Sequence, residues 1–395
     1  MSSCLLFSNP DKSVVLVDIP RSIELAQVTQ GHTPSSRLVS CPPLDKPWQN
    51  SHKSQEPNVS QPASALIDEL MICGTVRHAY MEMTDKYKGD WCLPRICRPI
   101  AELPSAEDST EAPVVSKKRK LPAREPETNR DNGAEPCIIP SGSNYLLGSI
   151  ESQRDAFLGT APQFDIVVLD PPWPSRSVRR KTKDRYKTAY DMQEMHDLLS
   201  MIPLAGHLKD NSIVAVWVTN KPAVIDLLKS PGGLFDQWDV EPISEWIWVK
   251  VTSKGEPVVD IESTWRKPWE RLLFARRKGG SLKLQPERNV IFGVPDLHSR
   301  KPNIRALLDD ALPKDYQGLE VFSRNLTAGW WSWGDQTLLF QEKHHWVDDS
   351  LSLEQGPKLR VDGAGTHTLA RSGRSGRCDS LMRVANEMQD NVRHT

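Results

Sequence analysis

The sequence lacks several features that would place it in common protein classes. No apolar run approaches 18 residues, which excludes a membrane-spanning helix, and no basic region followed by an apolar stretch indicates a secretory signal. The seven cysteines contain no Cys-x-x-Cys pair, so we expect reduced thiols in an intracellular protein and no metal site. The formal net charge is −1, so any nucleic-acid binding must come from a local basic patch.

Composition divides the chain into four parts. Residues 1–60 are rich in Ser, Pro and Gln, and we expect a largely irregular N-terminal extension. Residues 61–136 are expected to hold an accessory helix over 65–83, where apolar residues recur at three- and four-residue steps, followed by a charged linker. Residues 137–342 are expected to form the main domain, and the polar residues 343–395 a disordered tail.

Within the main domain, strand-like apolar runs alternate with helical patterns. The expected strands are 164–169, 212–218, 245–250, 271–275 and 318–322. The expected helices are 192–201, 221–228 and 304–312. Near-continuous apolar strands interleaved with helices predict an α/β fold in which a mostly parallel sheet is covered on both faces.

The strand over 164–169 ends in Asp170-Pro171-Pro172-Trp173. Two consecutive prolines force a stiff, extended exit from the strand, which holds Asp170 at the sheet edge where ligands of α/β proteins bind. The Asp170 carboxylate and the Pro171 carbonyl are suited to accept the two hydrogens of a weakly nucleophilic amine, such as the N6 amine of adenine. Trp173 offers a flat face for a base. The alternative is a rigid turn in which Trp173 only packs in the core.

The segment FDIVVLDPPW resembles the DPPW-type (MT-A-type) N6-adenine methyltransferases. Further segments resemble family motifs in the same order: WVTN at 217–220, EWIWVK at 245–250, HSRKP at 298–302, LEVFSRN at 319–325 and GWWSWG at 329–334. Their order and spacing are most similar to the branch of methyltransferase-like protein four. The resemblance implies a permuted Rossmann-like fold for the catalytic domain over 137–342, and S-adenosyl-L-methionine as the cofactor.

The resemblance also implies roles for single residues. The implied catalytic residues are Asp170, Pro171, Pro172 and Trp173, and the implied cofactor-binding residues are Lys301, Phe322, Arg324, Asn325, Gln336 and Asp170. Lys301 would pair with the methionine carboxylate of the cofactor, although an ordinary surface lysine is the alternative. Glu245 resembles a family glutamate near the acceptor adenine; it could instead face solvent or pair with Arg271.

A basic stretch follows the DPPW segment, with seven Arg and Lys residues between 176 and 187 against the single acid Asp184. We expect the substrate-binding residues Arg179, Arg180 and Lys183 to hold phosphates of the target strand, and Tyr186 to stack on or gate the base. A solvated loop is the alternative.

Single-stranded RNA presents its bases directly, whereas a duplex must flip the adenine out, so RNA is the expected substrate. The family branch implies a small nuclear RNA adenosine, with or without a 2′-O-methyl group. The alternatives are DNA N6-adenine methylation, transfer to cytosine or a protein amide, and a catalytically inactive nucleic-acid-binding subunit. A monomer and an assembly with a protein partner both remain open, and no membrane association is expected. The run Lys117-Lys118-Arg119-Lys120 favours a nuclear protein, with a cytosolic location also open.

Overall fold

The computed structural model describes residues 3–48, 62–97, 136–174, 191–263, 266–284, 288–297, 299–308 and 310–348. The basic stretch 176–187 and the run 117–120 lie outside these residues, so the predictions made for them are not tested by the fold. In the described ranges no helix is long and apolar enough to cross a membrane.

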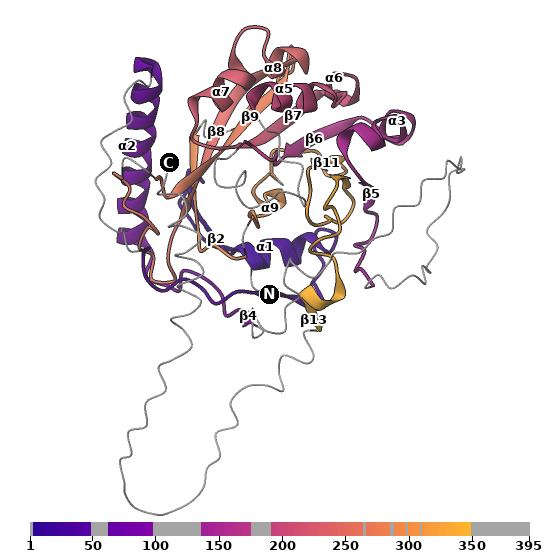
Figure 1. Ribbon diagram of the computed structural model, residues 1–395. Coiled ribbons are helices and arrows are strands. Elements are labelled where there is room, and N and C mark those ends of the chain that lie inside the picture. Colours follow the sequence, from indigo (N-terminus) through magenta and orange to yellow (C-terminus); the bar gives the residue numbers. More distant parts are fainter. Residues whose placement is uncertain are drawn as a thin grey trace, which may run out of the picture.

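A ten-stranded sheet forms the centre of the protein, with the strand order β1-β2-β10-β8-β9-β7-β6-β11-β12-β5 (Figure 1). β1 and β9 run antiparallel to their neighbours, and the other pairings in this sheet are parallel. The strands are β1 (Leu5–Ser8), β2 (Val14–Val17), β5 (Asn144–Leu147), β6 (Phe164–Leu169), β7 (Leu208–Val218), β8 (Val240–Lys250), β9 (Trp269–Arg277), β10 (Arg288–Gly293), β11 (Gly318–Val321) and β12 (Trp331–Gly334). This arrangement confirms the predicted α/β fold with a mostly parallel sheet.

Helices cover both faces of the sheet (Figure 1). One face packs against α2 (Ala63–Lys86), α3 (Ile150–Thr160), α5 (Met192–Ser200), α6 (Leu204–His207), α7 (Pro222–Lys229) and α8 (Leu234–Gln237). The opposite face packs against α1 (Ile19–Ala26) and α9 (Arg305–Leu308). The helix predicted over 304–312 is therefore confirmed only in its first half.

α2 confirms the accessory helix predicted over 65–83. Its buried side chains Ile72, Val76, Ala79 and Met83 are three or four positions apart, so they form one stripe that packs on β2, β8 and β10. The helix continues through Gly74, around which there is open space.

The prediction that residues 1–60 are largely irregular is wrong for residues 3–48. All four residues of β2 are buried, and β2 pairs in parallel with β10 from the far end of the chain. The Asp18 side chain caps the start of α1, where it accepts a hydrogen bond from the backbone N–H of Arg21. The short apolar segment 14–17 forms a strand of the large sheet because it pairs with β10. This partner is distant in the sequence, so the local pattern did not predict the strand.

The start of the predicted disordered tail is also ordered. Residues 343–348 form a 3-10 turn, η2 (Lys343–His345), and the strand β13 (Trp346–Asp348). β13 pairs with β3 (Ser36–Ser40), which also pairs with β4 (Ile96–Cys97) in a second, three-stranded sheet. This small sheet joins the last described strand to two segments from the first hundred residues.

Candidate active site

Asp170 lies at the edge of the sheet where the parallel strands end. It follows directly on β6, and its backbone N–H donates to the Val321 carbonyl of β11 over 3.3 Å. Its carboxylate oxygens lie 3.2 Å from Lys301 Nζ and 3.4 Å from Arg324 Nη1, and only 16% of the side chain is exposed. The predicted catalytic carboxylate is therefore held between two cations and largely shielded from water.

The ion pairs extend beyond Asp170 to a glutamate that the sequence analysis did not single out. Glu270, at the start of β9, lies 3.1 Å from Lys301 Nζ and also pairs with Lys250. Burial alone would raise the pKa of Glu270, but the two lysines lower it to about 2. Burial opposes the charge on Lys301, and Asp170 and Glu270 nevertheless hold its pKa above the usual value. Both partners are thus ionised near neutral pH.

A cavity of about 40 Å³ lies beside these charges. Its lining includes Asp170, Lys301, Glu320, Phe322, Arg324 and Asn325. Gln336 lies next to this group, because its side-chain oxygen accepts a hydrogen bond from Arg324 Nε over 3.2 Å. The structure therefore brings together all the residues that the sequence resemblance assigned to the cofactor.

Glu320 is a further cavity residue that sequence reasoning missed, although it lies inside the LEVFSRN segment. Burial and the nearby charge of Asp170 raise its pKa to about 8, against a smaller opposing effect of Arg324. A carboxyl with this pKa is mostly protonated at neutral pH and can donate a hydrogen bond. It therefore differs chemically from Glu270, whose pKa is lowered.

Two non-glycine residues of the cavity wall have left-handed backbones, Ser299 with φ of 69° and Phe322 with φ of 60°. The Phe322 N–H donates to the Trp333 carbonyl of β12 over 2.6 Å, which holds this conformation. Gly334 permits the close approach, because a Cβ atom there would lie 3.1 Å from Phe322 Cα. Backbone strain of this kind concentrates at functional sites, where surrounding structure enforces it.

The structure argues against the stacking role predicted for Trp173. Its side chain is only 8% exposed and packs in the core beneath α5 and α7. Its indole Nε1–H donates to the Trp217 carbonyl over 2.7 Å. The Pro171 carbonyl accepts the Trp173 backbone N–H over 2.8 Å, and one of its lone pairs remains for a substrate amine. Trp173 thus matches the alternative reading, a core residue that fixes the turn.

The resemblance implied a position near the acceptor adenine for Glu245, but this residue lies on the face of the sheet opposite to Lys301. It shares a face of β8 with Ile247 and Val249, which pack against α2, and it is ion-paired with Arg271 and Arg288. Glu270 is paired with Trp248 in the sheet and points to the opposite face, where Lys301 lies. The alternative of a pair with Arg271 is therefore correct, and Glu270 is the strand-end carboxylate beside Asp170.

Sequence similarity to known proteins assigns a family to this chain. The MT-A70 family model matches residues 164–336, which includes Asp170 and Gln336. The protein named "N6-methyladenosine RNA methyltransferase MTA1" from Cryphonectria parasitica is 42% identical over 353 residues, 87% of this chain and 94% of that protein. The chain belongs to the MT-A70 family. This membership confirms the predicted enzyme class, an N6-adenine methyltransferase with a Rossmann-like fold.

Two other relatives match a smaller part of the chain. The human "N(6)-adenine-specific methyltransferase METTL4" is 34% identical over 230 residues, 55% of this chain and 46% of that protein. A "DNA N6-methyl methyltransferase" of Caenorhabditis elegans is 30% identical over 209 residues, 52% of this chain and 54% of that protein. The relatives of this chain thus include one protein named for RNA methylation and one named for DNA methylation.

Proposed function

We propose that this MT-A70 protein transfers a methyl group from S-adenosyl-L-methionine to the N6 amine of adenine in RNA. The observation that carries the proposal is the position of Asp170, held at the carboxyl edge of the sheet beside Lys301 and Arg324. The similarity to an RNA methyltransferase along nearly the whole of both chains favours RNA over DNA.

The residues around the cavity fit S-adenosyl-L-methionine chemically. When bound, this cofactor supplies an electrophilic methyl group on a sulfonium centre. Lys301, kept cationic, matches the methionine carboxylate, and Phe322, Asn325 and Gln336 suit the adenosine. Lys301 and Arg324 both line this cavity, so we expect them to exchange their pairing with Asp170 for contacts to the ligand.

Release from these cations would prepare Asp170 for its role. A carboxylate and the remaining lone pair of the Pro171 carbonyl can accept the two hydrogens of an adenine amine and orient it toward the methyl group. The Pro-Pro sequence and the hydrogen bond from Trp173 to Pro171 fix both acceptors before the substrate arrives. The chain therefore acts mainly by positioning and by electrostatic support, rather than through a strong base.

Several finer points extend the proposal. The basic residues Arg179, Arg180 and Lys183 would hold phosphates of the RNA, with Tyr186 at the base; an adenosine in small nuclear RNA is the proposed target. A pair of oligonucleotides that differ only in a 2′-O-methyl group tests this preference. We also propose a nuclear location, which imaging of the protein with and without substitutions in the run 117–120 would test.

Methyl transfer to matched RNA and DNA oligonucleotides tests the function. The wild type is compared with Asp170→Asn and with Asp165→Asn, a control on the same strand whose carboxylate pairs with Lys209. We expect N6-methyladenosine from RNA with the wild type and the control, and a loss on the order of 10²-fold in Asp170→Asn. Binding of labelled cofactor should persist in Asp170→Asn, because the substitution leaves Lys301 and Arg324 available.

Three results would contradict parts of this proposal. Undiminished transfer by Asp170→Asn would remove Asp170 from the chemistry. Transfer to DNA alone would make the DNA alternative correct. Cofactor binding without transfer to either polymer would favour the catalytically inactive subunit.

A further inference from the structure

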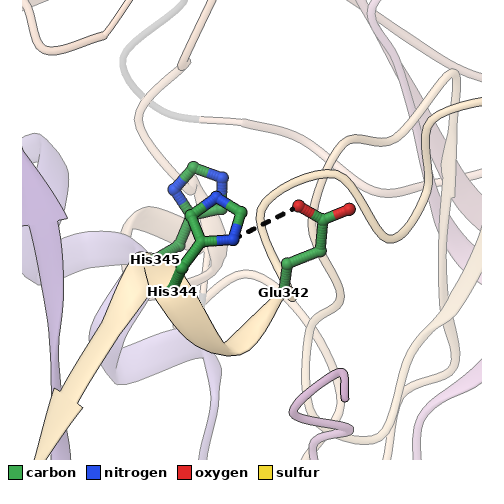
Figure 2. Close-up of side chains that lie close together, drawn as sticks. All are labelled: Glu342, His344 and His345. Carbon is green, nitrogen blue, oxygen red and sulfur yellow. Dashed lines mark ion pairs between the residues drawn. The ribbon is translucent and has the colours of Figure 1, made fainter. Parts of the chain in front are cut away.

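The turn that follows the last strand of the large sheet brings three ligand-type side chains together. Glu342 precedes η2, and His344 and His345 lie within it, so the spacing is Glu-x-His-His. One ligand atom from each residue lies within 4.8 Å of the others. Among the described residues, this is the group of His, Cys, Asp or Glu side chains that lie close enough together to hold a metal ion. Figure 2 shows the Glu342 carboxylate facing the His344 ring, with the His345 ring close behind it.

The distances within the cluster are compatible with a shared metal ion. Glu342 Oε2 lies 3.5 Å from His344 Nδ1, and the two imidazole rings have centroids 4.0 Å apart. With metal–ligand bonds of about 2.0–2.2 Å, neighbouring ligand atoms of a tetrahedral zinc site are roughly 3.3–3.5 Å apart. The Glu342–His344 distance already matches this value. The ligand atoms of the cluster are up to 4.8 Å apart, and rotation of the Glu342 side chain, 40% of which is exposed, would bring its carboxylate closer to His345.

A second observation points to a ligand. His345 is only 8% exposed, and its Nδ1 is buried without a hydrogen-bond partner among the described residues. A buried polar atom left unpaired usually costs about 1–3 kcal/mol, so such atoms commonly have an unseen partner. The His345 ring also rests edge-on against Phe340, with centroids 5.4 Å apart, which restricts its rotation.

The backbone around the cluster is held on both sides. Lys343 N–H donates to the Pro136 carbonyl over 3.0 Å, and Glu342 forms a bridge with Cys137. On the other side, Trp346 pairs with Leu38 in the small sheet. The three side chains therefore project from a turn whose ends are anchored to other parts of the fold, and a bound ion would need little backbone ordering.

We propose that Glu342, His344 and His345 form a binding site for a divalent transition metal such as Zn²⁺. Two imidazoles and one carboxylate are a ligand set that Zn²⁺ takes, with a fourth position left for water. Phe340 connects this site to the cofactor cavity, whose wall it also forms. The ion would link the turn after β12 to that wall.

Zinc binding to the chelator-treated, full-length protein tests this site. The wild type, His344→Ala and Glu342→Gln are titrated with ZnCl₂ by calorimetry and compared with His196→Ala. The control removes another histidine that lies beside a carboxylate, 3.4 Å from Asp197, but outside the cluster. We expect the wild type and the control to bind one Zn²⁺ more than His344→Ala. Glu342→Gln should weaken that binding at least ~10-fold, since changes even in residues behind the ligands have such effects.

Spectroscopy separates a metal site from a general stabilising effect. Co²⁺ added to the wild type should give the visible absorption of a tetrahedral site, and His344→Ala should lose it while its circular dichroism stays native. His344 and Glu342 are chosen because they are more exposed than His345 and their loss should not disturb the core. Equal zinc stoichiometry and affinity in the wild type and folded His344→Ala would overturn the proposal, as would a wild type that binds no Zn²⁺.

Discussion

Glu320 makes stability depend on pH in a direction that can be predicted. Its pKa is raised from 4.5 to about 8 in the folded protein, chiefly by burial. Between these values the folded state keeps a proton that the unfolded chain releases. The stabilisation is therefore complete below about pH 4.5 and is lost as the pH rises through about 8. Replacing the carboxyl by an amide in Glu320→Gln removes this titration.

The size of the effect follows from the same values. With pKa values of 4.5 and about 8, the free energy of unfolding falls by on the order of 2–3 kcal/mol between pH 6 and pH 9 through this one group. Glu320 lines a cavity rather than the sealed core, so we expect the lower part of this range. The wild type should lose stability relative to Glu320→Gln by that amount over the interval.

Urea unfolding at pH 5, 6, 7.5 and 9, followed by tryptophan fluorescence, measures the difference between the two proteins. At pH 5 the folded wild type and the folded variant both carry a mostly uncharged group at position 320. The free energy of unfolding at pH 5 therefore serves as the reference value for each protein. A wild-type curve that falls away from the variant between pH 6 and pH 9 is the expected result. Parallel curves over the whole range would show that Glu320 titrates normally and that the argument from burial is incorrect.

Three further predictions concern residues whose roles the structure changed or left open. Trp173→Phe should lower the free energy of unfolding by roughly 1 kcal/mol, because the hydrogen bond to the Trp217 carbonyl is lost, and the KM for RNA should not change. A raised KM with unchanged stability would instead support the hypothesis that Trp173 stacks on the base. Glu245→Gln should lower the free energy of unfolding by roughly 1–3 kcal/mol, because Arg271 loses its buried partner and keeps only Asp68, whereas unchanged stability with impaired turnover would support the substrate role. Arg179→Ala with Arg180→Ala should reduce the salt slope of RNA binding by roughly one to two; an unchanged slope would contradict phosphate contact.

Local patterns were sufficient for the parts of the fold where neighbouring residues decide the conformation. The strand predicted over 164–169 coincides with β6, because a continuous apolar run is ended by two prolines that cannot extend the ladder. α2 was also predictable, since its buried stripe repeats at helical spacing. The motif order within 164–336 then identified the family, which the family model confirmed.

The identity of the acids at the site depended on strand pairing. Glu245 and Glu270 both lie in strand-forming segments, and nothing local separates them. β9 is antiparallel within an otherwise parallel region, so Glu270 lies at the edge where β6 and β11 end, on the face that carries Lys301. Glu245 points to the other face and is neutralised by two arginines. Register and strand direction decided the assignment.

The sequence by itself determined the fold class, the placement of Asp170 after a buried strand and the family, because these rest on short-range patterns and on motif order. Only the tertiary structure decided that the apolar segment 14–17 joins the large sheet, that Trp173 packs in the core, and that the Glu-x-His-His turn is ordered. Each of these depends on a partner far away in the chain. Burial and pairing at such contacts are properties of the whole fold, and no local spacing encodes them.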